Sequence, residues 1–144
     1  MAVVLFTAPD GLLPAFLLTA AFYAVTVGLT ILIETPVIVR GGVTDNKRYI
    51  AGINIVTNAL LQLSLAVVLQ LERAVSGRAA FAAHPLVLLW FTLAELILIP
   101  VSEALAYGKI SPAGTKRIFA FTYLANLASC AAGLVLEALI RTVF

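Results

Sequence analysis

Four glutamates lie inside apolar runs of the sequence, where no lysine or arginine lies at the same depth. They are Glu34, Glu95, Glu103 and Glu137. Of the nine lysines and arginines, eight lie between the apolar runs and the ninth, Arg141, lies at the end of the last one. A charge at the centre of a membrane helix costs about 2.5 to 3.5 kcal/mol, whereas an interhelical hydrogen bond returns only about 0.6 kcal/mol. We therefore expect the deeper glutamates to be protonated at neutral pH through desolvation, to bind a cation, or to face water.

A proline lies within one turn of two of these glutamates. Pro36 follows Glu34 in ILIETPVIVR, and Pro100 precedes Glu103 in IPVSEALAYGK. Proline removes the hydrogen bond to the carbonyl four residues earlier, so a free carbonyl is expected beside each acidic position. Broken helices with free carbonyls next to a carboxylate are a common way to build cation sites in transporters. The alternative is a plain kink whose free carbonyl is satisfied by a threonine hydroxyl, that of Thr30 or Thr92.

The elements that carry these residues are apolar enough to be membrane spans. The 144 residues are 62% hydrophobic and only 11% charged, with a mean hydropathy of +1.10, far from the roughly 25% charged residues of soluble domains. About 20 apolar residues cross a hydrocarbon core of about 30 Å. Four such segments lie near residues 14–39, 49–71, 86–108 and 118–141. We predict an all-α fold, a bundle of four transmembrane helices forming one domain over residues 1–144.

Polar residues recur at helical spacing along each expected span, which indicates a bundle with a polar interior, because hydrocarbon offers polar side chains no partner. From them we predict a proton- or cation-binding site made of Glu34, Glu103, Asn58, Asn126 and Glu95. A pathway continuing from this site is predicted along Thr26, Thr30, Thr92, Asn54, Thr122 and Glu137.

The two halves of the chain match one another in their charged residues. A shift of 69 positions lays Glu34 on Glu103, Arg40 on Lys109, Lys47 on Lys116 and Arg48 on Arg117, and a shift of 68 lays Asn58 on Asn126. We interpret this as a tandem, parallel duplication of a two-helix hairpin, with halves near residues 12–71 and 81–141. The pseudo-twofold axis would then run along the membrane normal.

Basic residues are concentrated in two of the connections. These are Arg40, Lys47 and Arg48 in the first, and Lys109, Lys116 and Arg117 in the third. Only three basic residues lie elsewhere, so the positive-inside rule places these connections in the cytoplasm and both termini outside. Tyr49, Tyr107 and Trp90 are expected at the interfaces as an aromatic belt. The expected location is the cytoplasmic membrane of a bacterium or archaeon.

Three classes of function fit these features. The first is proton- or cation-linked transport of a small solute or ion. The second is a non-catalytic subunit or assembly factor, in which the polar face docks a helix of a larger membrane complex. The third, an intramembrane lipid-modifying enzyme, is less favoured because a single histidine and a single cysteine give no metal or nucleophile cluster. The expected partners are the bilayer, a proton or small cation, and a second copy or a larger complex. No cofactor is expected, and a net charge of +2 is too small to indicate nucleic acid.

Overall fold

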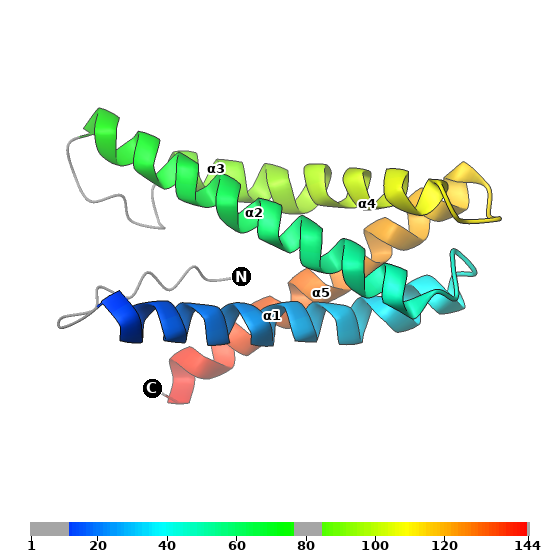
Figure 1. Cartoon of the computed structure of the whole chain (residues 1–144), viewed down its shortest axis with the longest axis horizontal. Coiled ribbons are helices and arrows are strands. Elements are labelled where there is room, and N and C mark those ends of the chain that lie inside the picture. The colour runs from blue at the N-terminus through cyan, green and yellow to red at the C-terminus, as the bar shows by residue number, and fades with distance from the viewer. Residues whose placement is uncertain (1–11, 77–84, 144) are drawn as a thin grey trace.

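The structure is a computed structural model that describes residues 12–76 and 85–143, all of it helical apart from the short loops. Its elements are α1 (Leu12–Arg40), α2 (Lys47–Ser76), α3 (Pro85–Leu93), the π-helical turn η1 (Ala94–Leu98), α4 (Ile99–Gly108) and α5 (Thr115–Val143). α3, η1 and α4 follow one another without a loop and form one long helix (Figure 1). The described part thus contains four helices that are long and apolar enough to cross a membrane, as predicted.

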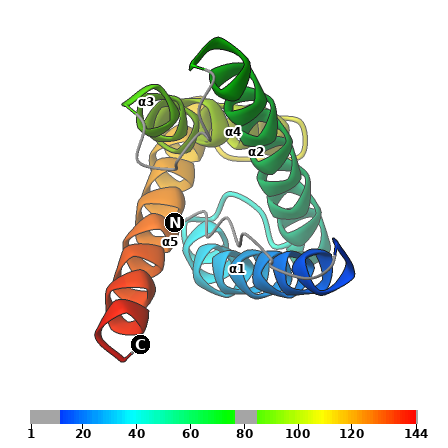
Figure 2. The same cartoon turned by 90° about the vertical axis from the view of Figure 1, so that its left-hand side faces the viewer.

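The four long helices form a ring. α1 packs against α2 and α5, and α4 packs against α2 and α5. Viewed from one end, the order around the ring is α1, α2, α3–η1–α4 and α5 (Figure 2). α1 and α2 lie close together beside the loop of residues 41–46 and diverge toward their other ends (Figure 1). α1 and α2 are therefore closest together at the end that carries the two short loops.

The hydrophobic core lies at that same end. Its buried members are Ile38, Val43, Ile50, Ala104, Tyr107, Ile118 and Ala125. Large aliphatic side chains elsewhere point outward on every long helix, and Leu32, Leu60, Leu105 and Leu127 are each more than half exposed. Soluble monomers rarely expose so much contiguous apolar surface. The outer surface therefore has the character expected of helices that face lipid.

Helix α1 ends in a Schellman motif. The backbone N–H of Gly42 bonds to the carbonyl of Val39 at 2.9 Å, and the N–H of Val43 bonds to the carbonyl of Ile38 at 3.1 Å. Gly42 has a φ of 63°, which costs least for glycine because it has no Cβ. Ile38 and Val43 are both fully buried, which supplies the hydrophobic contact that accompanies this motif.

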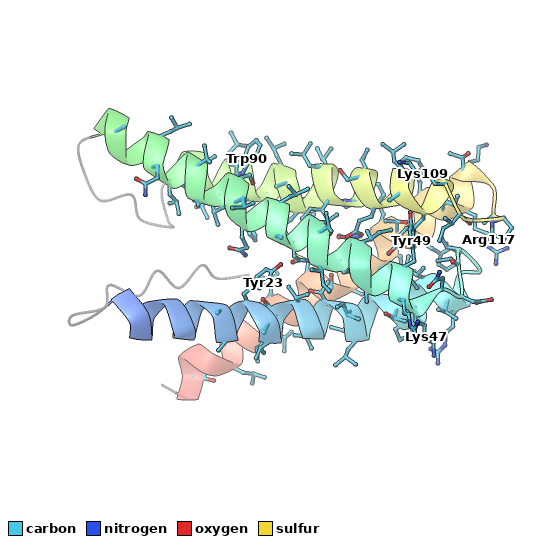
Figure 3. All side chains as sticks on the ribbon, viewed as in Figure 1. Tyr23, Lys47, Tyr49, Trp90, Lys109 and Arg117 are labelled. Atoms are coloured by element: carbon cyan, nitrogen blue, oxygen red, sulfur yellow. The ribbon has the colours of Figure 1, made fainter. Side chains whose placement is uncertain are left out.

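The loop after α1 is held by the start of α5. The Nε of Arg117 donates a hydrogen bond of 2.6 Å to the carbonyl of Gly41. A Cβ on Gly41 would lie 2.4 Å from Cγ of Phe121, so only glycine fits against this ring. Lys47 and Lys109 lie at this end of the molecule as well (Figure 3). The two short loops and their basic residues thus occupy one end of the bundle.

Tyr107 lies in the core and not at the surface, so its predicted place in an aromatic belt is wrong. It is fully buried, with its ring centroid 6.3 Å from that of Tyr49. Tyr49 reaches across from α2 and donates a hydrogen bond of 2.9 Å to the carbonyl of Ala106. This contact between α2 and α4 covers the Tyr107 ring, which hydropathy alone does not reveal.

The two prolines lie in different local structures. α1 continues as an α-helix through Pro36 to Arg40. Before Pro100 the chain instead widens into η1, where the N–H of Ile99 donates to the carbonyl of Ala94, five residues earlier. A π turn changes the angular spacing of the side chains around the helix. As a result Thr92, which precedes η1, is exposed although Glu103, which follows it, is buried. Ser102, the neighbour of Glu103 on α4, is exposed as well, so the single polar face predicted for this span does not form.

Candidate functional site

The Glu103 carboxyl is buried and hydrogen-bonded on both oxygens. Its exposed fraction is 1%. Oε1 lies 2.8 Å from the Thr57 hydroxyl on α2, and Oε2 accepts a hydrogen bond of 2.7 Å from Nδ2 of Asn126 on α5. The same Asn126 amide also donates to the carbonyl of Thr122 at 3.1 Å, which uses both of its hydrogens. Glu103 is therefore fixed from two neighbouring helices.

The Glu34 carboxyl is equally buried but is held on one side only. Its exposed fraction is also 1%, and Oε1 lies 2.7 Å from the Ser129 hydroxyl on α5. Its second oxygen, Oε2, is buried and has no hydrogen-bond partner among the described residues. Glu34 therefore retains one acceptor oxygen that no described residue fills.

Helix α5 connects the two carboxyls. Asn126 and Ser129, which hold Glu103 and Glu34 respectively, are three residues apart, about 4.5 Å along the helix axis. The Ser129 hydroxyl also lies 3.0 Å from the backbone carbonyl of Asn126. The two acids thus belong to one polar centre, and all the hydrogen-bond partners of their oxygens in residues 12–76 and 85–143 are neutral.

The hydroxyl partners of the two carboxyls suit either protonation state. Thr57 Oγ1 has one hydrogen but lies 3.0 Å from the carbonyl of Ile53 as well as 2.8 Å from Glu103. If Glu103 is ionised, Thr57 donates to it; if Glu103 carries a proton on Oε1, it donates to Thr57, whose own hydrogen turns to Ile53. The Ser129 hydroxyl can likewise donate its hydrogen either to Glu34 or to the carbonyl of Asn126. Rotation of a hydroxyl therefore lets this centre accommodate either protonation state without movement of heavy atoms.

Unsatisfied oxygens surround this centre. Each long helix contributes one buried side-chain oxygen that has no hydrogen-bond partner among the described residues: Glu34 Oε2, Asn54 Oδ1, Tyr107 Oη and Thr122 Oγ1. An unsatisfied buried polar group costs about 1 to 3 kcal/mol. Oxygen atoms bind protons, and they are the ligands that hard cations prefer. Within the same residues no three His, Cys, Asp or Glu side chains group together as a metal site.

The second helix presents Asn54 and Thr57 to the interior. Asn54 is fully buried, with its side chain beside the Glu34 carboxyl. Asn58, predicted to serve a carboxyl, is buried as well, but its amide donates to the backbone carbonyl of Asn54 at 2.9 Å. Periodicity predicted the polar side of α2 and placed Asn58 in the site and Asn54 on the pathway, whereas it is Asn54 whose side chain lies beside Glu34.

The remaining predicted pathway residues differ in burial and in their hydrogen-bond partners. Thr26 is buried and Thr30 half-buried, and both hydroxyls donate to carbonyls of their own helix, those of Tyr23 at 2.9 Å and Thr26 at 3.0 Å. Thr122 is fully buried and belongs to the polar centre. Thr92 is exposed and donates to the carbonyl of Leu88 at 2.8 Å. It therefore lies away from the interior.

Of the other two predicted acidic residues, only Glu95 has a described side chain. Glu95 is half-buried in η1, about two turns from Glu103. Glu137 lies on α5, but its side chain is outside the part of the structure that is described. The described centre is thus built on Glu34 and Glu103.

Two residues of this centre were not predicted as site residues. Thr57 and Ser129 supply the hydroxyls that contact the acids. A signal for both was present in the sequence, because each lies three residues after a predicted interior asparagine, Asn54 or Asn126. Spacing of three on a helix places two side chains on one face. Serine and threonine residues on a polar face should therefore be considered as site residues together with the acidic and amide residues.

Comparison of this chain with models of protein families, with curated proteins and with solved structures finds no match.

Proposed function

We propose that this chain is an integral membrane protein in which Glu34 and Glu103 form a proton-binding pair for proton- or cation-linked transport. The observation that carries this proposal is the burial of two carboxyls, each 1% exposed, among neutral hydrogen-bond partners only. Removal of a carboxylate from water costs several kcal/mol when no cation compensates it. A bound proton or a small cation removes that cost, so the binding of one to the pair is energetically favourable.

The hydroxyl geometry supports the proton over a cation as the primary ligand. Thr57 and Ser129 can each reverse the sense of their hydrogen bond, so a protonated and an ionised carboxyl both find partners at the same atomic positions. A carrier of protons needs both states to be accessible. A purely structural polar cluster gains nothing from this reversibility.

The placement of the polar side chains favours transport over the docking of a partner helix. Glu34, Asn54, Glu103 and Asn126 are buried against one another within a single chain. A face that docks another protein would leave such residues exposed in the isolated chain. The outward surfaces of the four helices are aliphatic and suit lipid.

The proposal also includes the orientation of the chain in the membrane and its evolutionary origin. The loops at residues 41–46 and 109–114 face the cytoplasm, since both carry or adjoin the basic residues, and both termini lie outside. The chain arose by duplication of a helical hairpin, which accounts for the charged residues that match at a spacing of 69. The carboxyl pair then lies in the cytoplasmic half of the bilayer.

Proton flux into vesicles tests the proposal. The purified protein is reconstituted with an entrapped pH-sensitive dye, and a potassium diffusion potential drives protons inward. We expect Glu34→Gln and Glu103→Gln to reduce the flux to that of protein-free vesicles, because glutamine fits the same hydrogen bonds but cannot titrate. Asp45→Asn, at an exposed loop acid, is the matched control and should retain full flux. Full flux in both glutamine variants would refute the proposal.

Labelling by a hydrophobic carbodiimide reports on the same acids independently of flux. This reagent reacts with protonated carboxyls in apolar surroundings, so labelling should occur at residue 34 or 103 at neutral pH and decline as the pH rises. Peptide mapping by mass spectrometry identifies the labelled residue. Labelling confined to acids outside the bundle would count against a buried, neutral pair.

A further inference from the structure

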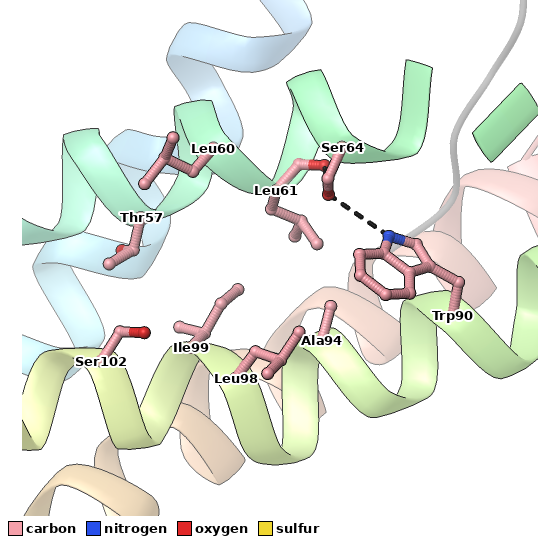
Figure 4. A pocket seen from close by; sticks show the side chains of 9 residues that line it. All are labelled: Thr57, Leu60, Leu61, Ser64, Trp90, Ala94, Leu98, Ile99 and Ser102. Carbon is pink, nitrogen blue, oxygen red and sulfur yellow. Dashed lines mark hydrogen bonds between the residues drawn. The ribbon is translucent and has the colours of Figure 1, made fainter. Parts of the chain in front are cut away.

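A groove runs along the outside of the bundle between α2 and α4. Its larger part, about 490 Å³, is lined from Arg48 through Gly52, Val56 and Leu60 on one side and by Ser102 and Ala106 on the other. A second part of about 170 Å³ continues toward Ser64 and Trp90 (Figure 4). Both parts include Thr57, Leu60 and Ser102, so they form one continuous groove, here called the α2–α4 groove.

The α2–α4 groove is apolar along its length and charged at one end only. Leu60, Leu61 and Ile99 form much of its wall, and the Trp90 indole is tied to Ser64 by a hydrogen bond of 3.3 Å. The single charged residue that lines it is Arg48, which is exposed at the loop end of α2. Lys47 and Lys109 lie at that end too (Figure 3). An occupant must therefore combine a long apolar part with an anionic end.

Along α2 the α2–α4 groove runs from Arg48 to Ser64, about 24 Å at 1.5 Å per residue, and its first part, from Arg48 to Thr57, has the length of one leaflet of a bilayer. Nine residues of α2 separate Arg48 from Thr57, which is about 14 Å at 1.5 Å per residue. Half of a hydrocarbon core is about 15 Å. A chain anchored at Arg48 would reach the middle of the membrane at Thr57, the residue whose hydroxyl contacts Glu103 on its inner side.

We infer that the α2–α4 groove binds one anionic phospholipid, with the phosphate on the Arg48 guanidinium and one acyl chain along Val56 and Leu60. Guanidinium groups bind phosphate with charge-assisted, often bidentate hydrogen bonds. Basic pockets between helices at the cytoplasmic face are typical sites of anionic headgroups. The inference uses the membrane location and orientation given in the proposed function, but it does not depend on the carboxyl pair.

Native mass spectrometry of the intact chain tests this site. The protein in mild detergent is titrated with phosphatidylglycerol or phosphatidylcholine, and the fraction carrying one lipid is measured. We expect about tenfold tighter retention of phosphatidylglycerol, and Arg48→Gln should remove this preference, because one charge-assisted contact is worth about one factor of ten. Arg40→Gln, at an exposed basic residue outside the groove, should keep it. Equal preference in both variants, or an equal loss in both, would overturn the inference.

A second pair of variants tests the apolar part. Leu60→Trp fills the α2–α4 groove and should weaken retention of both lipids, whereas Leu63→Trp, also exposed on α2 but outside the groove, should not. A lipid-free dimer that Leu60→Trp abolishes would instead assign the groove to a second copy of the chain. Glu34→Gln and Glu103→Gln should leave lipid retention unchanged, since neither residue lines the groove. Loss of flux and loss of lipid binding are thus separate results.

Discussion

Glu34 and Glu103 occupy matching positions in the two halves of the sequence, yet the protein holds them differently. Glu103 is bonded on both oxygens by α2 and α5, whereas Glu34 is bonded on one oxygen by α5 alone. Glu103 is therefore the more fixed acid of the two. Within the proposed function, Glu34, with one oxygen that no described residue fills, is the member that exchanges its proton.

The same contrast extends to the ends of the helices. Arg117 lies over the Phe121 ring, 5.9 Å from its centroid, and bonds to the first loop. Its counterpart at the 69-residue shift, Arg48, is exposed and lines the α2–α4 groove. One arginine of the matched pair therefore braces the bundle, and the other is available for an external ligand.

The largest expected difference is between leucine substitutions of the two acids. Glu103→Leu should reduce the free energy of unfolding by about 3 kcal/mol, because it removes two hydrogen bonds to a carboxyl and leaves a buried N–H of Asn126 unpaired. Glu34→Leu should cost less than about 1 kcal/mol, since Ser129 keeps its bond to the carbonyl of Asn126 and an unpaired oxygen disappears. Unfolding by SDS in mixed micelles, followed by Trp90 fluorescence, measures both. If both leucine variants lost the same free energy of unfolding, Glu103 would not be held more firmly than Glu34.

A smaller effect is expected from glycine substitutions in the two loops. Gly41→Ala places a Cβ against the Phe121 ring and should cost about 2 kcal/mol through overpacking. Gly114→Ala, in the second loop, meets open space and should be close to neutral. The same unfolding assay compares them. A neutral Gly41→Ala would mean that α5 does not press on the first loop.

The smallest effect is expected from the two arginines. Arg117→Gln should cost about 1 kcal/mol, the value of one hydrogen bond to the Gly41 carbonyl. Arg48→Gln should leave the stability in lipid-free detergent unchanged, because Arg48 is exposed at the mouth of the groove. Equal stability of the two variants would show that the bracing role of Arg117 is negligible.

The sequence predicted the helices, and the burial of both acids, because these follow from hydropathy and helical spacing alone. Glu34 and Glu103 lie on polar faces of apolar segments, and a polar face in such a segment turns inward. The contact of Asn126 with Glu103 agrees with the predicted grouping of these two residues.

What the sequence could not supply is the rotation of each helix about its axis. Asn54 and Asn58 are one turn apart, so the choice of which lies beside Glu34 depends on how α2 packs against α1. The exposure of Thr92 depends on η1, whose wider turn breaks the uniform spacing on which the prediction relied. The prediction of Tyr107 in an interfacial aromatic belt fails because hydropathy gives depth along the membrane normal but not position around the bundle.

The bond between Arg117 and Gly41 joins residues 76 positions apart, and Ser129 is 95 positions from Glu34. During synthesis, the first hairpin therefore leaves the ribosome long before the helix that completes it. Until then the Gly41 carbonyl and the Glu34 carboxyl both lack their partners. Assembly of the polar centre is thus a late event that awaits α5, the helix that supplies both of these partners.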